Sequence, residues 1–121
     1  MSEKVDAITV RALLMLGIYP NTKGFRYLRR AVSLYISGRE SRAQSSAQLY
    51  KEVAKPFETT GGAVERSIRH AIQSGWHRRN RRFADMVFYA LLQGQNDVPS
   101  NTLFISALGE YVGRESVISS K

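Results

Sequence analysis

The chain has 121 residues, no cysteine, and 18 lysines and arginines against 10 acidic residues, a net charge of +8 at pH 7. This length suits one domain with a single core, and the lack of cysteine excludes disulfides, thiolate zinc sites and cysteine nucleophiles. The polar N-terminus is unlike a signal peptide, and no apolar run could span a bilayer. We therefore expect a cytoplasmic protein without a membrane segment, formed by one helical domain over residues 1–116 and a frayed tail over 117–121.

Apolar residues at helical spacing predict the first three helices. The first runs from Ser2 to Gly17, where glycine ends it. After a turn, the second extends over 25–36 and stops at Ser37-Gly38. A polar loop over 39–46 leads to a third helix over 49–54, which Pro56 ends or frays near Lys55.

The second half of the chain continues the helical pattern. A fourth helix is predicted from Gly62 to Trp76, with its apolar residues on one face. A basic connector over 77–82 separates it from a fifth helix over 83–91. Ser100 is a suitable N-cap for the last helix, which is expected to end near Gly113. Because no stretch alternates with period two, the predicted fold class is all-α, with six helices.

The positive charge is concentrated in two short stretches. Residues 23–42 and residues 62–82 each hold six basic residues against one glutamate, a net +5 each, whereas the remainder of the chain is slightly acidic. A local excess of arginine suits a surface that binds a polyanion, because each phosphate contact releases a condensed counterion. A basic surface that is merely solvated is the alternative interpretation.

The third and fourth helices, joined by a short turn that contains Gly61 and Gly62, have the layout of a helix-turn-helix over about residues 46–76. In this motif the second helix enters the major groove of DNA. If Val64 and Ile68 face the core, Glu65 and Arg66 project outward near the start of that helix. Arginine can bind guanine through O6 and N7, and glutamate can accept from the cytosine amino group. These two residues are the predicted base readers.

Further residues around the fourth helix are predicted to contact the DNA backbone or to support the base readers. Thr60 and Gly62 lie where helix N-terminal amides could approach a phosphate, although a simple cap is the alternative for Thr60. Glu65 and Arg69 could equally form an exposed ion pair. The complete predicted supporting set is Thr60, Gly62, Arg69, His70, Gln73, Arg78, Arg79, Arg81 and Arg82.

Catalysis and metal binding find no support in the sequence. His70 and His77 lie seven residues apart, but neither has a carboxylate or cysteine at metal-ligand spacing. No nucleophile elbow, phosphate-loop glycine signature or carboxylate pair is visible. We expect no enzyme activity, no metal and no cofactor.

Several segments resemble the C-terminal DNA-binding domain of stage zero sporulation protein A, a transcription factor of spore-forming Firmicutes. They are Gly24-Phe25-Arg26-Tyr27-Leu28-Arg29-Arg30-Ala31, Leu49-Tyr50-Lys51-Glu52-Val53-Ala54-Lys55, Phe57-Glu58-Thr59-Thr60, Val64-Glu65-Arg66-Ser67-Ile68-Arg69-His70-Ala71-Ile72 with Trp76, and Pro99-Ser100-Asn101. The resemblance spans nearly the whole chain and implies a six-helix effector domain in which Glu65 and Arg66 read a short DNA box. It also implies pairing of two copies on repeated boxes and, as a further candidate partner, the sigma subunit of RNA polymerase.

The sequence departs from that family in three ways. The chain begins almost at the first helix, so we expect a stand-alone domain without a phosphoacceptor receiver. Gly62 and Ala63 replace the family's serine and arginine, so the preferred box is expected to differ. The connector over 77–82 is far more basic than its counterpart, which favours stronger backbone binding over activation through RNA polymerase.

The predicted function is sequence-specific binding of double-stranded DNA by a transcriptional regulator. The alternative is a protein-interaction module, such as a receiverless antagonist or adaptor, whose basic faces meet an acidic partner and bind nucleic acid at most nonspecifically.

Overall fold

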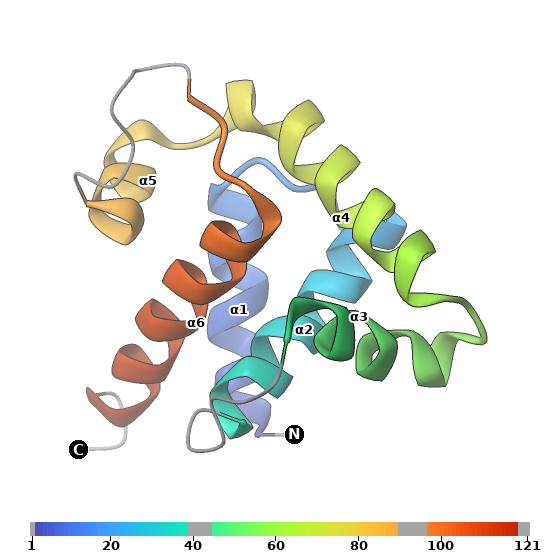
Figure 1. Cartoon of the computed structure of the whole chain (residues 1–121). Coiled ribbons are helices and arrows are strands. Elements are labelled where there is room, and N and C mark those ends of the chain that lie inside the picture. Colours follow the sequence, from blue (N-terminus) through green and yellow to red (C-terminus); the bar gives the residue numbers. More distant parts are fainter. Residues whose placement is uncertain (1, 39–44, 90–96, 119–121) are drawn as a thin grey trace.

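The computed structural model describes residues 2–38, 45–89 and 97–118, which form an all-α fold with no strand in these ranges. Figure 1 shows the arrangement. The helices are α1 (Glu3–Met15), α2 (Lys23–Ser37), α3 (Ser46–Ala54), α4 (Gly61–Gly75), α5 (Arg81–Phe88) and α6 (Asn101–Ile118), with two short 3-10 helices, η2 (Lys55–Phe57) and η3 (Trp76–Arg78). The prediction of a six-helix all-α domain is confirmed.

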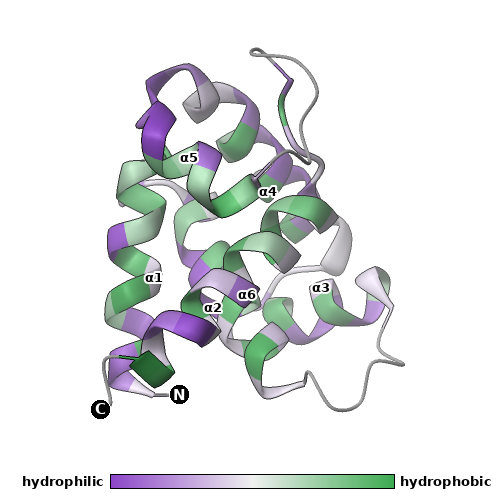
Figure 2. Ribbon diagram, turned by 90° about the vertical axis from the view of Figure 1, so that its left-hand side faces the viewer, coloured by the Kyte–Doolittle hydropathy of each residue, from purple (hydrophilic) through white to green (hydrophobic). Residues whose placement is uncertain are grey.

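Helix α2 lies at the centre of the fold and packs against α1, α3, α4 and α6. Helices α1 and α6 lie side by side, and α3 and α4 pack together on the other side of the molecule (Figure 1). Most helices carry both hydrophobic and hydrophilic segments along their length (Figure 2). Their apolar side chains form one core, in which Leu13, Leu28, Ile68 and Phe104 are completely buried.

Each of the six helices begins with a polar side chain that accepts a hydrogen bond from a main-chain N–H three residues later. This N-cap satisfies one of the amides that lack an intrahelical partner. The capping residues are Ser2, Thr22, Ser45, Thr60, Asn80 and Ser100. The prediction that Ser100 caps the last helix is therefore confirmed.

Two glycine contacts set how closely α4 approaches its neighbours. A Cβ atom on Gly24 of α2 would lie 2.4 Å from the Cβ of Ala71 and 2.7 Å from the carbonyl oxygen of Ser67 in α4. Gly17 adopts φ = +86°, and a Cβ there would lie 2.2 Å from the carbonyl oxygen of Gly75. Both positions require glycine because the facing atoms belong to the backbone or are already fixed.

Several predicted boundaries differ from the structure. Helix α4 begins at Gly61, one residue early, so both glycines belong to the helix, and the left-handed turn residue is Glu58 with φ = 53° and ψ = 46°. The expected connector over 77–82 is largely helical, because η3 and α5 occupy most of it. Helix α6 continues beyond Gly113 to Ile118, since Gly113 is buried inside the helix and does not end it.

Two predicted segments cannot be compared in full. The proposed loop over 39–46 lies mostly outside the described residues, and so do the last residues of the predicted fifth helix, Ala90 and Leu91.

Candidate nucleic-acid interface

Helices α3 and α4 form a compact helix pair whose turn is fixed from below by α2. Helix η2 continues α3 for three residues, and Glu58 then reverses the chain into the Thr60 cap of α4. The ring of Phe57 in η2 meets the ring of Tyr27 edge-on, with 5.1 Å between centroids. Aromatic pairs of this geometry add about 0.5–1.5 kcal/mol beyond burial, so the turn is held in one position relative to α2.

Helix α4 presents one buried face and one exposed face. Val64 and Ile68 are 0 % exposed and Ile72 is 1 % exposed, which fixes the rotation of the helix about its axis. The opposite face carries the exposed predicted site residues Gly62, Glu65, Arg66, Arg69, His70 and Gln73. The structure thus brings together on one surface the two predicted base readers and four of the predicted supporting residues.

The charged side chains of this exposed face are held only loosely. Arg69 Nη1 lies 3.8 Å from Glu65 Oε1, a long ion pair between two half-exposed side chains. Pairs of this kind contribute at most about 0.5 kcal/mol, so both groups can reorganise around a ligand at little cost. Arg66 Nη1 lies 3.4 Å from where a Cβ on Gly62 would stand, so the glycine leaves room for the guanidinium beside the helix N-terminus.

Thr60 acts as the N-cap of α4, with its hydroxyl accepting from the N–H of Ala63 at 3.1 Å. The amides of the first helical turn have no intrahelical acceptor, and they carry the positive end of the helix dipole. Gly61 and Gly62 leave these amides uncovered by any Cβ. The cap and an approach by a phosphate are compatible at this position.

Arg78 is engaged with the protein itself. Its Nε and Nη2 donate to the carbonyl oxygen of Gly17 at 3.2 and 2.9 Å, and Nη1 donates to the carbonyl oxygen of Ser74 at 3.1 Å. The guanidinium also lies 3.9 Å from the ring centroid of Tyr19. Arg78 therefore fastens the end of α4 to the turn between α1 and α2.

Arg79 is also fixed, because its Nη1 donates to the carbonyl oxygen of Trp76 at 2.8 Å and its guanidinium lies 4.6 Å from the centroid of that indole. Partial burial and then repulsion from Arg81 lower the pKa of Arg79 below its ordinary value. Trp76 is buried, and its Nε1 has no acceptor. The cation above the ring is its nearest polar neighbour of this kind.

Arg81 and Arg82 differ from the two preceding arginines because both are exposed, on the first turn of α5. Asn80 caps this turn, and its own N–H donates to the carbonyl oxygen of Met15 at 2.7 Å. The start of α5 is thereby tied to the end of α1. Of the four predicted connector arginines, these two extend from the surface, whereas Arg78 and Arg79 brace it.

His70 and His77 are both exposed at the surface of α4 and η3. Within the ranges that the structure describes, no group of three histidine, aspartate or glutamate side chains is placed to hold a metal ion. In the same ranges, no helix is long and apolar enough to cross a membrane.

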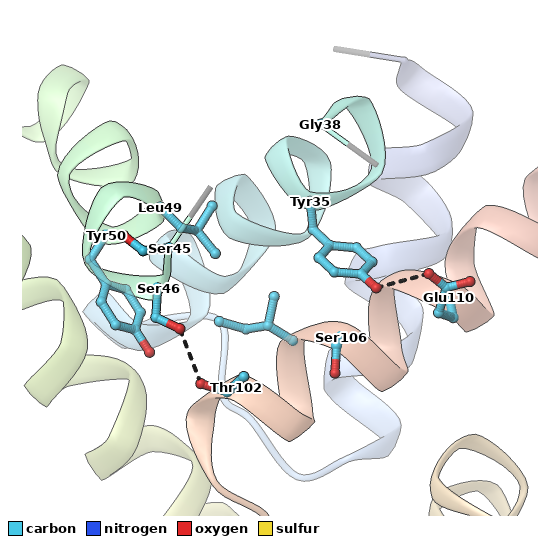
Figure 3. Close-up of a pocket in the computed structure, with 10 residues that line it drawn as sticks. Tyr35, Gly38, Ser45, Ser46, Leu49, Tyr50, Thr102, Ser106 and Glu110 are labelled. Atoms are coloured by element: carbon cyan, nitrogen blue, oxygen red, sulfur yellow. Dashed lines mark hydrogen bonds between the residues drawn. The ribbon is translucent and has the colours of Figure 1, made fainter. Parts of the chain in front are cut away.

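A separate pocket of about 340 Å³ lies between α2, α3 and α6 (Figure 3). Its lining is hydroxyl-rich, and Tyr35 donates to Glu110 Oε2 at 2.8 Å while Ser46 and Thr102 share a hydrogen bond of 3.3 Å. The described lining residues are Tyr35, Gly38, Ser45, Ser46, Leu49, Tyr50, Thr102, Ile105, Ser106 and Glu110. None of these residues is basic, so the pocket does not suit a phosphate and is distinct from the exposed face of α4.

One contact beside the candidate base readers was not anticipated. The side-chain amide of Asn101, at the start of α6, donates to the main-chain carbonyl oxygen of Glu65 at 3.0 Å. The two residues are far apart in the sequence, and no local pattern links them. The Pro99-Ser100-Asn101 segment signalled a helix start but gave no indication of its partner.

The comparison with known protein families supports the same surface. The family model described as Sporulation initiation factor Spo0A C terminal matches residues 9–112, which include every described helix at least in part. The match contains the whole α3–α4 pair and the exposed arginines of α5. The chain therefore belongs to the Spo0A C-terminal family of DNA-binding effector domains.

Proposed function

We propose that this protein is a sequence-specific regulator of transcription that binds double-stranded DNA by inserting α4 into the major groove. The observation that supports the proposal most strongly is the exposed face of α4, where groove-reading residue types lie opposite a fully buried apolar face. Membership of a DNA-binding family supports the same use of this face. Such a role would place the protein in the compartment that holds the chromosome.

The residues divide into two chemical roles in this proposal. Glu65 and Arg66, near the start of α4, read base edges through cytosine amino groups and guanine O6 and N7. The remaining contacts go to the backbone, which supplies affinity without sequence information. We assign them to Thr60 and Gly62 at the helix start, to Arg69, His70 and Gln73 along α4, and to Arg81 and Arg82, with Arg78 and Arg79 supporting the surface from within.

We also propose that two copies pair on repeated boxes and that the surface near α5 is available to the sigma subunit of RNA polymerase. The resemblance of the sequence to the sporulation effector domain supports both ideas. The exposed hydrophobic residues Met86 and Tyr89, 49 % and 64 % exposed, lie on or just after α5 and suit a protein contact.

The proposal is tested by selecting duplexes from a random library with the purified protein and measuring the selected duplex by fluorescence anisotropy. A scrambled duplex of equal length is the control, and both are titrated at two salt concentrations. We expect the selected duplex to bind at least about 1,000-fold more tightly than the scrambled one, as specific protein–DNA complexes do.

Two results would overturn the proposal. Equal binding of both duplexes that vanishes at the higher salt would leave only an electrostatic surface. No binding to either duplex, combined with capture of an acidic protein partner, would favour an adaptor that uses its basic faces for protein contacts.

A further inference from the structure

The first turn of α2 lies directly against the middle of α4. Gly24 makes this approach possible, because the Cβ of Ala71 and the carbonyl oxygen of Ser67 occupy the space that a side chain would need. Residues three apart are neighbours on a helix surface, so His70 and Ser74 lie next to Ser67 and Ala71. The exposed edge of α4 nearest α2 is therefore the edge that carries His70.

Two cations stand on this turn of α2. Lys23 and Arg26 are both exposed, and they are neighbours because they lie three residues apart. Within the described part of the chain, neither forms an ion pair with a carboxylate. Their charge is thus available to a ligand, unlike that of Arg29, which is bound to Asp6 at 2.6 Å.

The rest of α2 holds this turn rigidly. Arg30, one turn further along, donates from Nε and Nη2 to the carbonyl oxygen of Glu52 in α3, at 3.2 and 3.0 Å. Tyr27 packs against Phe57 in η2. The position of Lys23 and Arg26 relative to α4 is therefore fixed by contacts with all three parts of the helix-turn-helix.

We propose that Lys23 and Arg26 form a second contact to the duplex, binding the phosphates of the strand that borders α4 on its His70 side. The inference rests on the proposed function, in which α4 occupies the major groove. That groove is about 12 Å wide and is bordered by a sugar–phosphate backbone on each side. A helix in the groove brings the elements beside it against these backbones, and here the element on the His70 side carries two unpaired cations.

The same geometry assigns the opposite edge to a different chemistry. The Glu65 side of α4 is covered by the start of α6 through Asn101, where the neighbouring residues Ser100 and Thr102 are polar and uncharged. The cationic flank on the α2 side thus makes the interface asymmetric about the axis of α4.

The test compares the double variant Lys23→Gln/Arg26→Gln with Lys4→Gln/Arg11→Gln, which removes the same charge from exposed residues of α1. Affinities for the selected and scrambled duplexes are measured over a series of salt concentrations. Each lost phosphate contact lowers the slope of log K against log salt by about 0.9. We expect the α2 variant to lower the slope by about 1 to 2 and to weaken both duplexes by about the same factor, tenfold or more at 0.1 M salt, with a smaller change in the α1 variant. Unchanged thermal midpoints confirm that both variants are folded.

Equal slopes and affinities for the two double variants would overturn the inference, and the proposed function would stand if the unmodified protein still discriminated between duplexes. Conversely, a lower slope for the α2 variant in a protein that binds both duplexes equally would support this phosphate contact and overturn the sequence-specific function.

Discussion

The side-chain amide of Asn101 donates to the main-chain carbonyl oxygen of Glu65 at 3.0 Å, which joins the start of α6 to the first half of α4. Ser100, the preceding residue, caps α6 by accepting from the N–H of Leu103 at 3.1 Å. The cap fixes the first turn of α6, and the amide then fixes that turn against α4. The base-reading end of α4 is thereby positioned by a helix outside the helix-turn-helix.

Asn101→Ala is expected to reduce discrimination between duplexes without unfolding the protein. A single hydrogen bond contributes about 0.5–1.5 kcal/mol, which corresponds to about 2- to 10-fold in affinity. The loss should fall mainly on the selected duplex, because backbone contacts tolerate small shifts of α4 better than base contacts do. Affinities for selected and scrambled duplexes measure the ratio directly.

The matched control for Asn101→Ala is Ser106→Ala, which removes a side-chain hydrogen bond within α6, to the carbonyl oxygen of Leu103. This variant should leave discrimination unchanged. Equal behaviour of the two variants would show that Asn101 only stabilises α6 and does not position α4.

Arg66→Ala should flatten the sequence preference. A good arginine–guanine pair discriminates against the wrong base by about 1–3 kcal/mol, so the ratio of selected to scrambled affinity should fall about 5- to 150-fold. Arg82→Ala removes the same side chain from the surface of α5 and should weaken both duplexes equally. If Arg66→Ala left the preference intact, α4 would not be the reading helix in the orientation proposed.

The four arginines from 78 to 82 are expected to separate into two groups. Arg78→Ala removes three hydrogen bonds to carbonyl oxygens and the contact with Tyr19, so the free energy of unfolding should fall by about 1–3 kcal/mol. Arg81→Ala, at an exposed position, should change it by less than about 0.5 kcal/mol. Urea unfolding of the two variants gives both values.

DNA binding should separate the same arginines in the opposite sense. The double variant Arg81→Ala/Arg82→Ala should lower the salt slope by up to about 2, with equal losses for the two duplexes. Arg78→Ala should change the slope less, since its guanidinium already serves three carbonyl oxygens. A slope change as large in Arg78→Ala would mean that this arginine leaves the Gly17 carbonyl to bind a phosphate.

Helical periodicity predicted the elements and the inward face of α4 because both depend on neighbours along one helix. Val64, Ile68 and Ile72 are buried as the spacing required, so Glu65 and Arg66 follow on the outside. The roles of Arg78 and Arg79 were not predictable in this way, because their partners lie on Gly17, Tyr19 and the Trp76 ring. A run of arginines looks uniform in sequence, whereas the fold surrounds two of its members and leaves two exposed.

The turn between α3 and α4 shows a second limit of sequence reasoning. Paired glycines suggested the bend, but the left-handed residue is Glu58, and Gly61 lies inside α4. A Cβ on Gly61 would stand 3.3 Å from the main-chain nitrogen of Lys51, so this glycine allows α4 to approach α3. Glycine is favoured by turns and by close helix contacts alike, and only the packed structure separates the two causes.

Gly24→Ala should destabilise the protein and weaken DNA binding together. The new Cβ would stand 2.4 Å from the Cβ of Ala71 and 2.7 Å from the carbonyl oxygen of Ser67, so α2 and α4 must move apart. Overpacking of this kind costs about 1–3 kcal/mol, which exceeds the gain of about 0.5–1 kcal/mol from replacing a helical glycine by alanine. Urea unfolding measures the balance, and the salt slope shows whether Lys23 and Arg26 have moved away from the duplex.

Two further variants make the Gly24 experiment decisive. Gly62→Ala places its Cβ 3.4 Å from the flexible end of Arg66 and meets no backbone, so it should be neutral or slightly stabilising. Adding Ala71→Gly to Gly24→Ala removes the shorter of the two close contacts and should recover part of the lost stability, while the contact with the Ser67 carbonyl remains. If Gly24→Ala were as stable as the unmodified protein, the spacing of α2 and α4 would be adjustable, and the fixed placement of Lys23 and Arg26 beside α4 would fail with it.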